Sequence, residues 1–188
     1  AILDGSEPLT GWTQCQSQEE AGGNLNWQNI WVAYAPAGTT ANTANLYQAD
    51  AATGEEHMCW MAQDPNQPDP FFMDSIGGFY TIPCADVTTT SLVDPVRLTQ
   101  TDPHYWDGAY IMVWVQPNVV DARSINTFIP GEHRLTYNTI GSPYTDRDEH
   151  YALYNHIALL DTPGEYYFNE TAEPDGTHKV YLWPPAGN

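Results

Sequence analysis

The chain has 188 residues, and its hydrophobic content of 41% with 13% aromatic residues excludes a disordered chain. Its 24 acidic residues against 5 basic ones give a formal net charge of −19, which disfavours nucleic acid and anionic membrane surfaces as partners, because both are polyanions. The apolar runs are short and interrupted, so we expect no transmembrane helix, and the N-terminal stretch lacks the basic-then-apolar order of a signal peptide.

The strong acidity has two explanations, and both stay open. A hydrated acidic surface in a saline habitat produces such an imbalance without any bearing on the ligand. The same charge disfavours a strongly anionic polysaccharide as ligand, unless a bound cation or a local arginine offsets the repulsion.

Ten short runs predict β-strands, because each is aromatic or β-branched and is bounded by Gly, Pro, Asn or Asp. In chain order they are 29–35, 44–50, 55–63, 77–83, 96–100, 109–116, 125–130, 133–139, 164–170 and 178–185. Only 146–161 has apolar residues at helical spacing, enough for a turn or two of helix. We therefore expect an all-β fold, a jelly-roll-like β-sandwich of roughly ten short strands with a hairpin at its C-terminal end.

The run 109–116 is the clearest strand, because aliphatic side chains alternate along it with larger ones. The aliphatic residues Ile111, Val113 and Val115 share one face, and we place that face in the core. The opposite face, which carries Trp114, is either a second buried layer or an exposed aromatic platform.

The chain has three cysteines, Cys15, Cys59 and Cys84, an odd number without a C-x-x-C pair. This spacing disfavours a zinc site. Two alternatives remain for the thiols, either a single disulfide between Cys59 and Cys84 or three buried free thiols.

Seven Trp and twelve Tyr supply ample material for stacking on sugar rings, with carboxylates and amides for the sugar hydroxyl groups. Most Trp residues in a small β-domain belong to the core, so we favour those in polar, loop-like settings, and expect Trp31 and Trp114 to be packed. The predicted carbohydrate-binding residues are Asn26, Trp27, Trp60, Tyr105, Trp106 and Asp107.

The stretch 64–70 carries oxygen ligands at Asp64, Asn66 and Asp69, which makes it a candidate calcium loop. Its spacing is not that of an EF-hand, and a simple turn is the alternative. Apart from a structural calcium ion here, we expect no cofactor.

No catalytic residue is predicted. A glycosidase needs two carboxylates at a set separation, and with 24 acidic residues some pair always qualifies, so abundance identifies none. Glu165 stands out in "DTPGEYYF", but we expect its carboxylate to accept backbone N–H groups at the bend.

The segment 151–188 resembles a recurring segment of secreted right-handed parallel β-helix proteins, among them β-helix glycoside hydrolases and related polysaccharide-degrading enzymes. The resemblance rests on Asn155, Leu160, Asp161, Pro163, Gly164, Glu165, Tyr166, Tyr167, Tyr181, Trp183, Pro184 and Pro185. The earlier stretches 1–12, 55–72 and 105–118 fit the order of the same family. Gln63 departs from it, since the family tends to have arginine there, so no role of that arginine is carried over.

The resemblance implies a β-sandwich domain at 1–145, inserted into a β-helix, and a connecting segment with a hairpin at 146–188 that leads back to the helix. The family's catalytic carboxylates normally lie on the coils of the helix. We therefore expect a non-catalytic, carbohydrate-binding accessory domain of a secreted enzyme, extracellular and monomeric.

Its expected partners are the β-helix catalytic domain of the same parent chain and a neutral or weakly charged polysaccharide, such as an agarose-like galactan degraded by a marine bacterium. Two alternatives stay open. One is a purely structural insertion that stabilises the β-helix enzyme, and the other is a glycoside hydrolase fragment with its own carboxylate pair.

Overall fold

The computed structural model describes residues 8–41, 45–49, 56–66, 78–116, 119–144 and 146–185. These residues form strands joined by turns and single turns of 3-10 helix, so the predicted all-β class is confirmed and is consistent with a β-sandwich. Within the described ranges, no helix has the length and apolar character to cross a membrane.

The described residues form more strands than the ten expected, because several are only two or three residues long. They are β1 (Thr13–Gln14), β2 (Trp31–Ala35), β3 (Tyr47–Ala49), β4 (Glu56–Met58), β5 (Trp60–Met61), β6 (Gln63–Asp64), β7 (Tyr80–Ile82), β8 (Ser91–Val93), β9 (Tyr110–Gln116), β10 (Val119–Ile129), β11 (Arg134–Tyr137), β12 (Glu149–Tyr154), β13 (Glu165–Ala172) and β14 (His178–Leu182). The 3-10 turns are η1 (Trp27–Asn29), η3 (Cys84–Asp86), η4 (Pro130–Glu132) and η5 (Ile157–Leu159).

The chain divides into two compact units. The terminal unit consists of residues 1–61 and 160–188, and the middle unit of residues 62–159. The boundary expected at residue 145, which follows from the resemblance to β-helix proteins, stays a prediction. Within the structure, β12 pairs with β9 of the middle unit.

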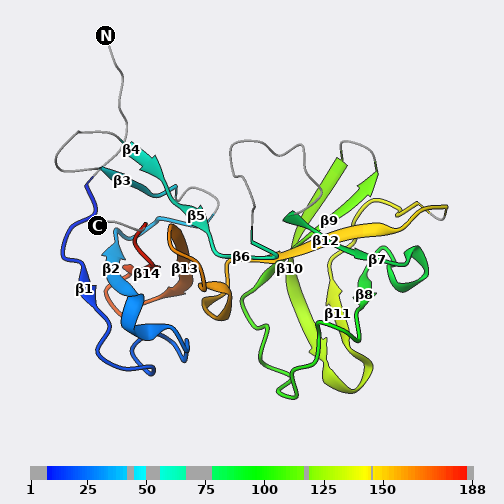
Figure 1. Cartoon of the computed structure of the whole chain (residues 1–188), viewed down its shortest axis with the longest axis horizontal. Coiled ribbons are helices and arrows are strands. Elements are labelled where there is room, and N and C mark those ends of the chain that lie inside the picture. Colours follow the sequence, from blue (N-terminus) through cyan, green and yellow to red (C-terminus); the bar gives the residue numbers. More distant parts are fainter. Residues whose placement is uncertain are drawn as a thin grey trace, which may run out of the picture. The chain divides into compact units, whose positions relative to one another are not determined.

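The terminal unit is built on a five-stranded sheet in the order β1-β2-β14-β13-β5, with β3 and β4 forming a separate two-stranded ribbon. Figure 1 shows the blue N-terminal strands β1 and β2 beside the red and orange C-terminal strands. Strand β14 runs antiparallel to both β2 and β13, whereas β5 runs parallel to β13. The sheet therefore requires both ends of the chain.

One face of this sheet carries the core of the terminal unit. The register places Leu182 opposite both Trp31 and Tyr166, so these three side chains share a face, and Val180 and Phe168 lie on it two residues further along their strands. The buried cluster on this face comprises Ala35, Ala41, Cys59, Tyr166, Phe168, Val180 and Leu182.

The middle unit contains a sheet in the order β6-β12-β9-β10-β11-β8, and β7 pairs with β12 as well. The long strand β10 joins two parts of this sheet, because its first half pairs with β9 and its second half with β11. Ile111, Val113 and Val115 of β9 are buried, as the sequence predicts. Trp114 on the opposite face is half-buried and packs against His150, with a ring-centroid distance of 6.0 Å.

One prediction of local structure is wrong, and another holds only in part. Residues 96–100 form no strand, because Asp94 Oδ1 accepts the backbone N–H groups of Val96 at 2.9 Å and Arg97 at 3.1 Å, which closes a turn. The segment 146–161 forms strand β12 before the single turn η5, because pairing with β9 and β7 outweighs the helical spacing of its apolar residues.

Of the two alternatives for the thiols, the disulfide between Cys59 and Cys84 does not form, since these two described residues and Cys15 are free. Cys15 and Cys59 are buried, as the alternative of buried thiols requires, whereas Cys84 in η3 is half-buried. Burial raises the pKa of the Cys15 and Cys59 thiols to about 11, so both stay protonated at neutral pH.

The bend before β13 depends on Glu165, as predicted. Its side chain is buried, and Oε2 accepts hydrogen bonds from the backbone N–H groups of Asp161 and Thr162, both at 3.3 Å. Gly164 supports the same turn with a φ of 91°, a left-handed conformation that favours glycine. Glu165 thus has a structural role at the point where the chain re-enters the terminal sheet.

We expect Glu165→Ala to lower the free energy of unfolding by about 1–3 kcal/mol, because it removes an acceptor from two backbone donors at a buried bend. Urea unfolding followed by circular dichroism measures this loss. Glu170→Ala is the matched control, since Glu170 lies exposed on the same strand and its removal should change stability by less than about 0.5 kcal/mol. Equal losses in the two variants would contradict the structural role.

Candidate functional site

A groove of about 1140 Å³ lies over the cluster-bearing face of the terminal sheet. Strands β13 and β14 line it with Tyr166, Phe168, Val180 and Leu182. The chain before β1, the loop after β2 and the β3–β4 ribbon supply the other sides. The described residues along the groove are Pro8, Leu9, Thr10, Trp12, Trp31, Tyr34, Ala35, Pro36, Ala37, Gly38, Thr39, Asn45, Leu46, Tyr47, Gln48, Ala49, Glu56, Tyr166, Phe168, Val180, Leu182 and Pro184.

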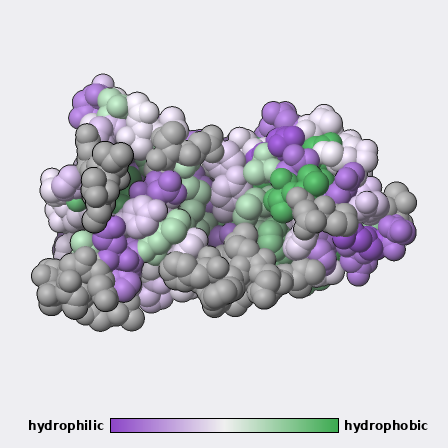
Figure 2. All heavy atoms as spheres, turned by 90° about the horizontal axis from the view of Figure 1, so that it is seen from above, coloured by the Kyte–Doolittle hydropathy of each residue, from purple (hydrophilic) through white to green (hydrophobic). Residues whose placement is uncertain are grey.

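Aromatic side chains are the main feature of this groove. Trp31 is 37% exposed and Tyr47 51%, although large aromatic residues of this kind usually bury most of their surface. Tyr34 also borders the groove, but the register places its side chain on the opposite face of the sheet, with Lys179 and Tyr181. Trp12 is half-buried, and its indole Nε1 donates to the carbonyl of Leu9 at 2.9 Å. Figure 2 shows that hydrophobic residues reach the visible surface of the molecule among hydrophilic ones.

Polar groups lie between the aromatic rings. The groove contains the side-chain amides of Asn45 and Gln48, the hydroxyl groups of Thr10 and Thr39, and the carboxylate of Glu56. Gln48 Oε1 is buried and has no hydrogen-bond partner among the described residues. A groove with aromatic faces and a few polar groups is the arrangement expected for a ligand that carries both apolar C–H faces and hydroxyl groups.

Three of the predicted sugar-binding residues, Asn26, Trp27 and Trp60, lie in the terminal unit but are not among the described groove residues. Asn26 and Trp27 are half-buried at η1, where the backbone N–H of Asn26 donates to Asn24 Oδ1 at 2.7 Å. Trp60 is half-buried on β5, at the edge of the sheet. The expectation that Trp31 is packed is wrong, because 37% of its surface is exposed on the groove.

The other three, Tyr105, Trp106 and Asp107, lie on one turn of the middle unit. Trp106 is only 3% exposed, with its ring centroid 4.9 Å from that of Tyr105 and 5.4 Å from that of His156. Its covered ring argues against sugar stacking at this position. Asp107 is exposed and lies 2.9 Å from Nδ1 of His104.

His156 is the buried partner of this aromatic turn. Its burial lowers the pKa of the imidazole to about 4, so the ring is neutral at physiological pH. Nδ1 accepts the backbone N–H of Ala158 at 3.3 Å. A neutral, enclosed imidazole packed against Trp106 favours a structural role for this cluster.

The candidate calcium loop is only partly described. Asp64 ends β6 and accepts a hydrogen bond from the hydroxyl of Tyr80, Asn66 is exposed, and Asp69 lies outside the described residues. The described ranges contain no group of three or more His, Cys, Asp or Glu residues that could hold a metal ion. Calcium at this loop stays a prediction.

Gln63, which stands where the β-helix family tends to have arginine, is buried beside Asp64. Its Nε2 donates to the carbonyls of Pro65 at 3.1 Å and Gly78 at 3.0 Å. The amide therefore joins the chain after β6 to the chain before β7.

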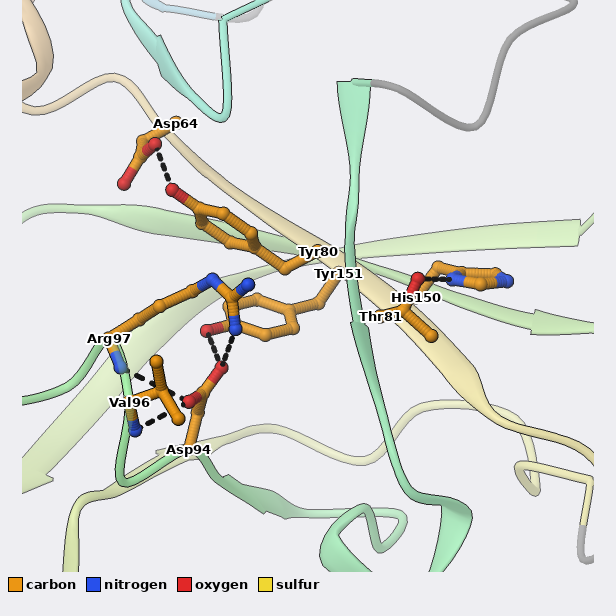
Figure 3. A network of polar contacts seen from close by, with 8 residues as sticks. All are labelled: Asp64, Tyr80, Thr81, Asp94, Val96, Arg97, His150 and Tyr151. Atoms are coloured by element: carbon orange, nitrogen blue, oxygen red, sulfur yellow. Dashed lines mark hydrogen bonds and ion pairs between the residues drawn. The ribbon is translucent and has the colours of Figure 1, made fainter.

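A polar network in the middle unit connects Asp94, Arg97, Tyr80 and Tyr151, as Figure 3 shows. Asp94 Oδ2 accepts from the Tyr151 hydroxyl at 2.8 Å and from Arg97 Nη1 at 3.1 Å, and the guanidinium lies 3.9 Å from the centre of the Tyr80 ring. Burial raises the pKa of Tyr80 to about 12 and that of Tyr151 higher still, so both hydroxyls remain donors. The network joins the 94–97 turn to β7 and β12, since the Tyr151 hydroxyl and the Tyr80 ring both contact the Asp94–Arg97 ion pair.

Glu149 is the exception among the buried charged groups. It is 0% exposed, and among the described residues its carboxylate oxygens make no hydrogen bond of good geometry, although the Tyr144 backbone lies close enough to favour the ionised form. Burial raises the pKa of this carboxyl, and the nearby Arg147 guanidinium only partly offsets the effect. A raised pKa is typical of general acids, but a carboxyl that is fully buried cannot contact a polymer. We therefore interpret Glu149 as a residue that destabilises the fold when ionised.

We expect Glu149→Gln to raise the melting temperature at pH 7, because the amide has the same shape and carries no charge into the core. The folded-state pKa of Glu149 lies above the unfolded value of about 4.3. The fold is therefore most stable, with respect to this group, below about pH 4.3, where the carboxyl is neutral in both states. This stability is lost as the pH rises through the folded-state pKa, because the buried carboxyl then becomes charged. The gain from Glu149→Gln should shrink between pH 7 and pH 4.

Differential scanning calorimetry at several pH values measures this gain. Asp148→Asn is the control, since it removes the same charge from an exposed neighbour. A gain that is equal in both variants, or that does not depend on pH, would show that burial of the Glu149 charge is not the cause.

Comparison with known proteins gives one informative result. No protein-family model and no curated protein matches the chain. A solved structure titled "Glycoside hydrolase" matches with a TM-score of 0.53 and 16% sequence identity, over 96% of this chain and 28% of that chain. The chain thus spans little more than a quarter of that protein's length and shares the fold of the corresponding part.

Proposed function

We propose that the chain is a carbohydrate-binding accessory domain of a larger, secreted polysaccharide-degrading enzyme, and that the groove of the terminal unit holds the polysaccharide. The observation that carries this proposal is the exposure of Trp31 and Tyr47 along one groove that also contains amide, hydroxyl and carboxylate groups. The similarity in fold to part of a protein titled "Glycoside hydrolase" supports the same assignment.

The chemistry of a sugar ring fits these walls. One face of a pyranose presents C–H groups that pack on an aromatic ring, while its edge presents hydroxyl groups that both donate and accept hydrogen bonds. Asn45, Gln48 and Thr39 lie within the groove to meet those hydroxyls. Binding of this kind requires no catalytic group, and the proposed accessory role requires none.

The charge of the chain supports a neutral or weakly charged ligand, such as an agarose-like galactan. The net charge of −19 repels polyanions over the whole surface, and the described residues of the groove include no lysine or arginine. A secreted, monomeric domain attached to a β-helix catalytic domain is the setting that we infer.

A structural insertion is the second candidate function, and one observation favours it. The chain matches 28% of a longer glycoside hydrolase chain, which is the relation expected of one part of a multidomain enzyme. Such a part can support its neighbours without binding sugar. A folded chain that binds no glycan would therefore favour this second function.

We expect Trp31→Ala and Tyr47→Ala each to weaken binding to a neutral galactan about tenfold, because each removes an aromatic face from the groove. Affinity electrophoresis in gels with a panel of neutral algal and plant polysaccharides gives the ligand, and calorimetric titration with its oligosaccharides gives the affinity.

Tyr144→Ala is the control, since Tyr144 is exposed to a similar extent but belongs to the middle unit. No retardation of the folded wild-type chain in any gel would refute the proposed function. If both groove variants are retarded as strongly as the wild type, the polysaccharide binds at a site other than the groove.

A further inference from the structure

We propose that Glu56 sets the charge selectivity of the groove, so that it admits glycans whose polar groups donate hydrogen bonds and rejects glycans that carry sulfate or carboxylate groups. This inference rests on the proposed glycan-binding function and adds to it the residue that discriminates between ligands.

Glu56 is the one residue with a formal charge among the described residues of the groove. It is exposed at the start of β4, opposite Ala49 of β3. The same ribbon carries Tyr47, one of the exposed aromatic walls. A ligand that stacks on Tyr47 therefore lies on the same ribbon as the negatively charged carboxylate of Glu56.

No cation is available nearby in the described terminal unit to cancel this charge. All four arginines of the chain belong to the middle unit, and the single lysine, Lys179, is held by Glu173 at 3.0 Å. Neither Lys179 nor any arginine is among the described groove residues.

The groove also contains a buried acceptor, on the opposite face of the ribbon from Glu56 and Tyr47. Gln48 Oε1 is buried without a hydrogen-bond partner among the described residues, and a buried acceptor is stabilised when a donor reaches it. Hydroxyl and ammonium groups donate, whereas sulfate and ionised carboxylate only accept. An ester sulfate on a ligand that stacks on Tyr47 would meet the like charge of Glu56, which lies on the same face of the ribbon, instead of a donor.

The test compares a neutral galactan with a sulfated galactan of similar backbone, agarose and κ-carrageenan, by affinity electrophoresis at pH 8 and constant ionic strength. The wild-type chain should be retained by agarose and not by carrageenan. Glu56→Gln should bind carrageenan at least about fivefold more tightly than the wild type, because one like charge at contact distance is removed, and should keep its affinity for agarose.

Glu19→Gln is the matched control, because it makes the same change in net charge at an exposed position of the terminal unit outside the described groove residues. Equal gains for Glu19→Gln and Glu56→Gln would assign the rejection to the overall charge and overturn the inference. Retention on agarose with no change in carrageenan binding on Glu56→Gln would also overturn it, while leaving the proposed function intact. Failure of the wild type to bind any neutral polysaccharide would overturn the proposed function and this inference with it.

Discussion

The pairing of β14 with both β2 and β13 is the interaction on which the terminal unit depends. Strand β14 contributes Val180 and Leu182 to the buried cluster, and its two neighbours come from opposite ends of the sequence. The β13–β14 pairing is a local hairpin, whereas the β2–β14 pairing is non-local, so the loop-closure entropy of the β2–β14 pairing must be offset before its burial is gained. The groove forms only when that sheet is closed, since its floor consists of β13 and β14 side chains.

Glu165 and the buried cluster act on the same strand in different ways. The carboxylate fixes the direction in which the chain enters β13, because it holds two backbone N–H groups of the preceding turn. Tyr166 and Phe168 then bury their rings on the groove side of the sheet. A short acidic motif that looks reactive in the sequence is therefore best understood as the support of a binding surface.

Some aromatic side chains of the protein are buried, whereas others are exposed to solvent. Only the exposed rings can contact a ligand. Trp106 is enclosed by Tyr105 and His156, whereas Trp31, on a strand of the sheet, remains accessible. The protein titled "Glycoside hydrolase" shares this fold over 28% of its own length.

The sequence by itself determined the all-β class, the alternation of β9 and the backbone-holding role of Glu165, because each follows from local spacing and hydrogen-bonding capacity. It could not determine that 149–154, within the segment of helical spacing, becomes a strand, since the apolar residues fit a helix locally and only pairing with neighbouring strands decides otherwise. It also could not separate Trp31 from Trp106, because exposure depends on which distant segments cover a ring. The tertiary structure alone decided the groove, whose lining comes from residues far apart in the chain that meet only when its two ends share one sheet.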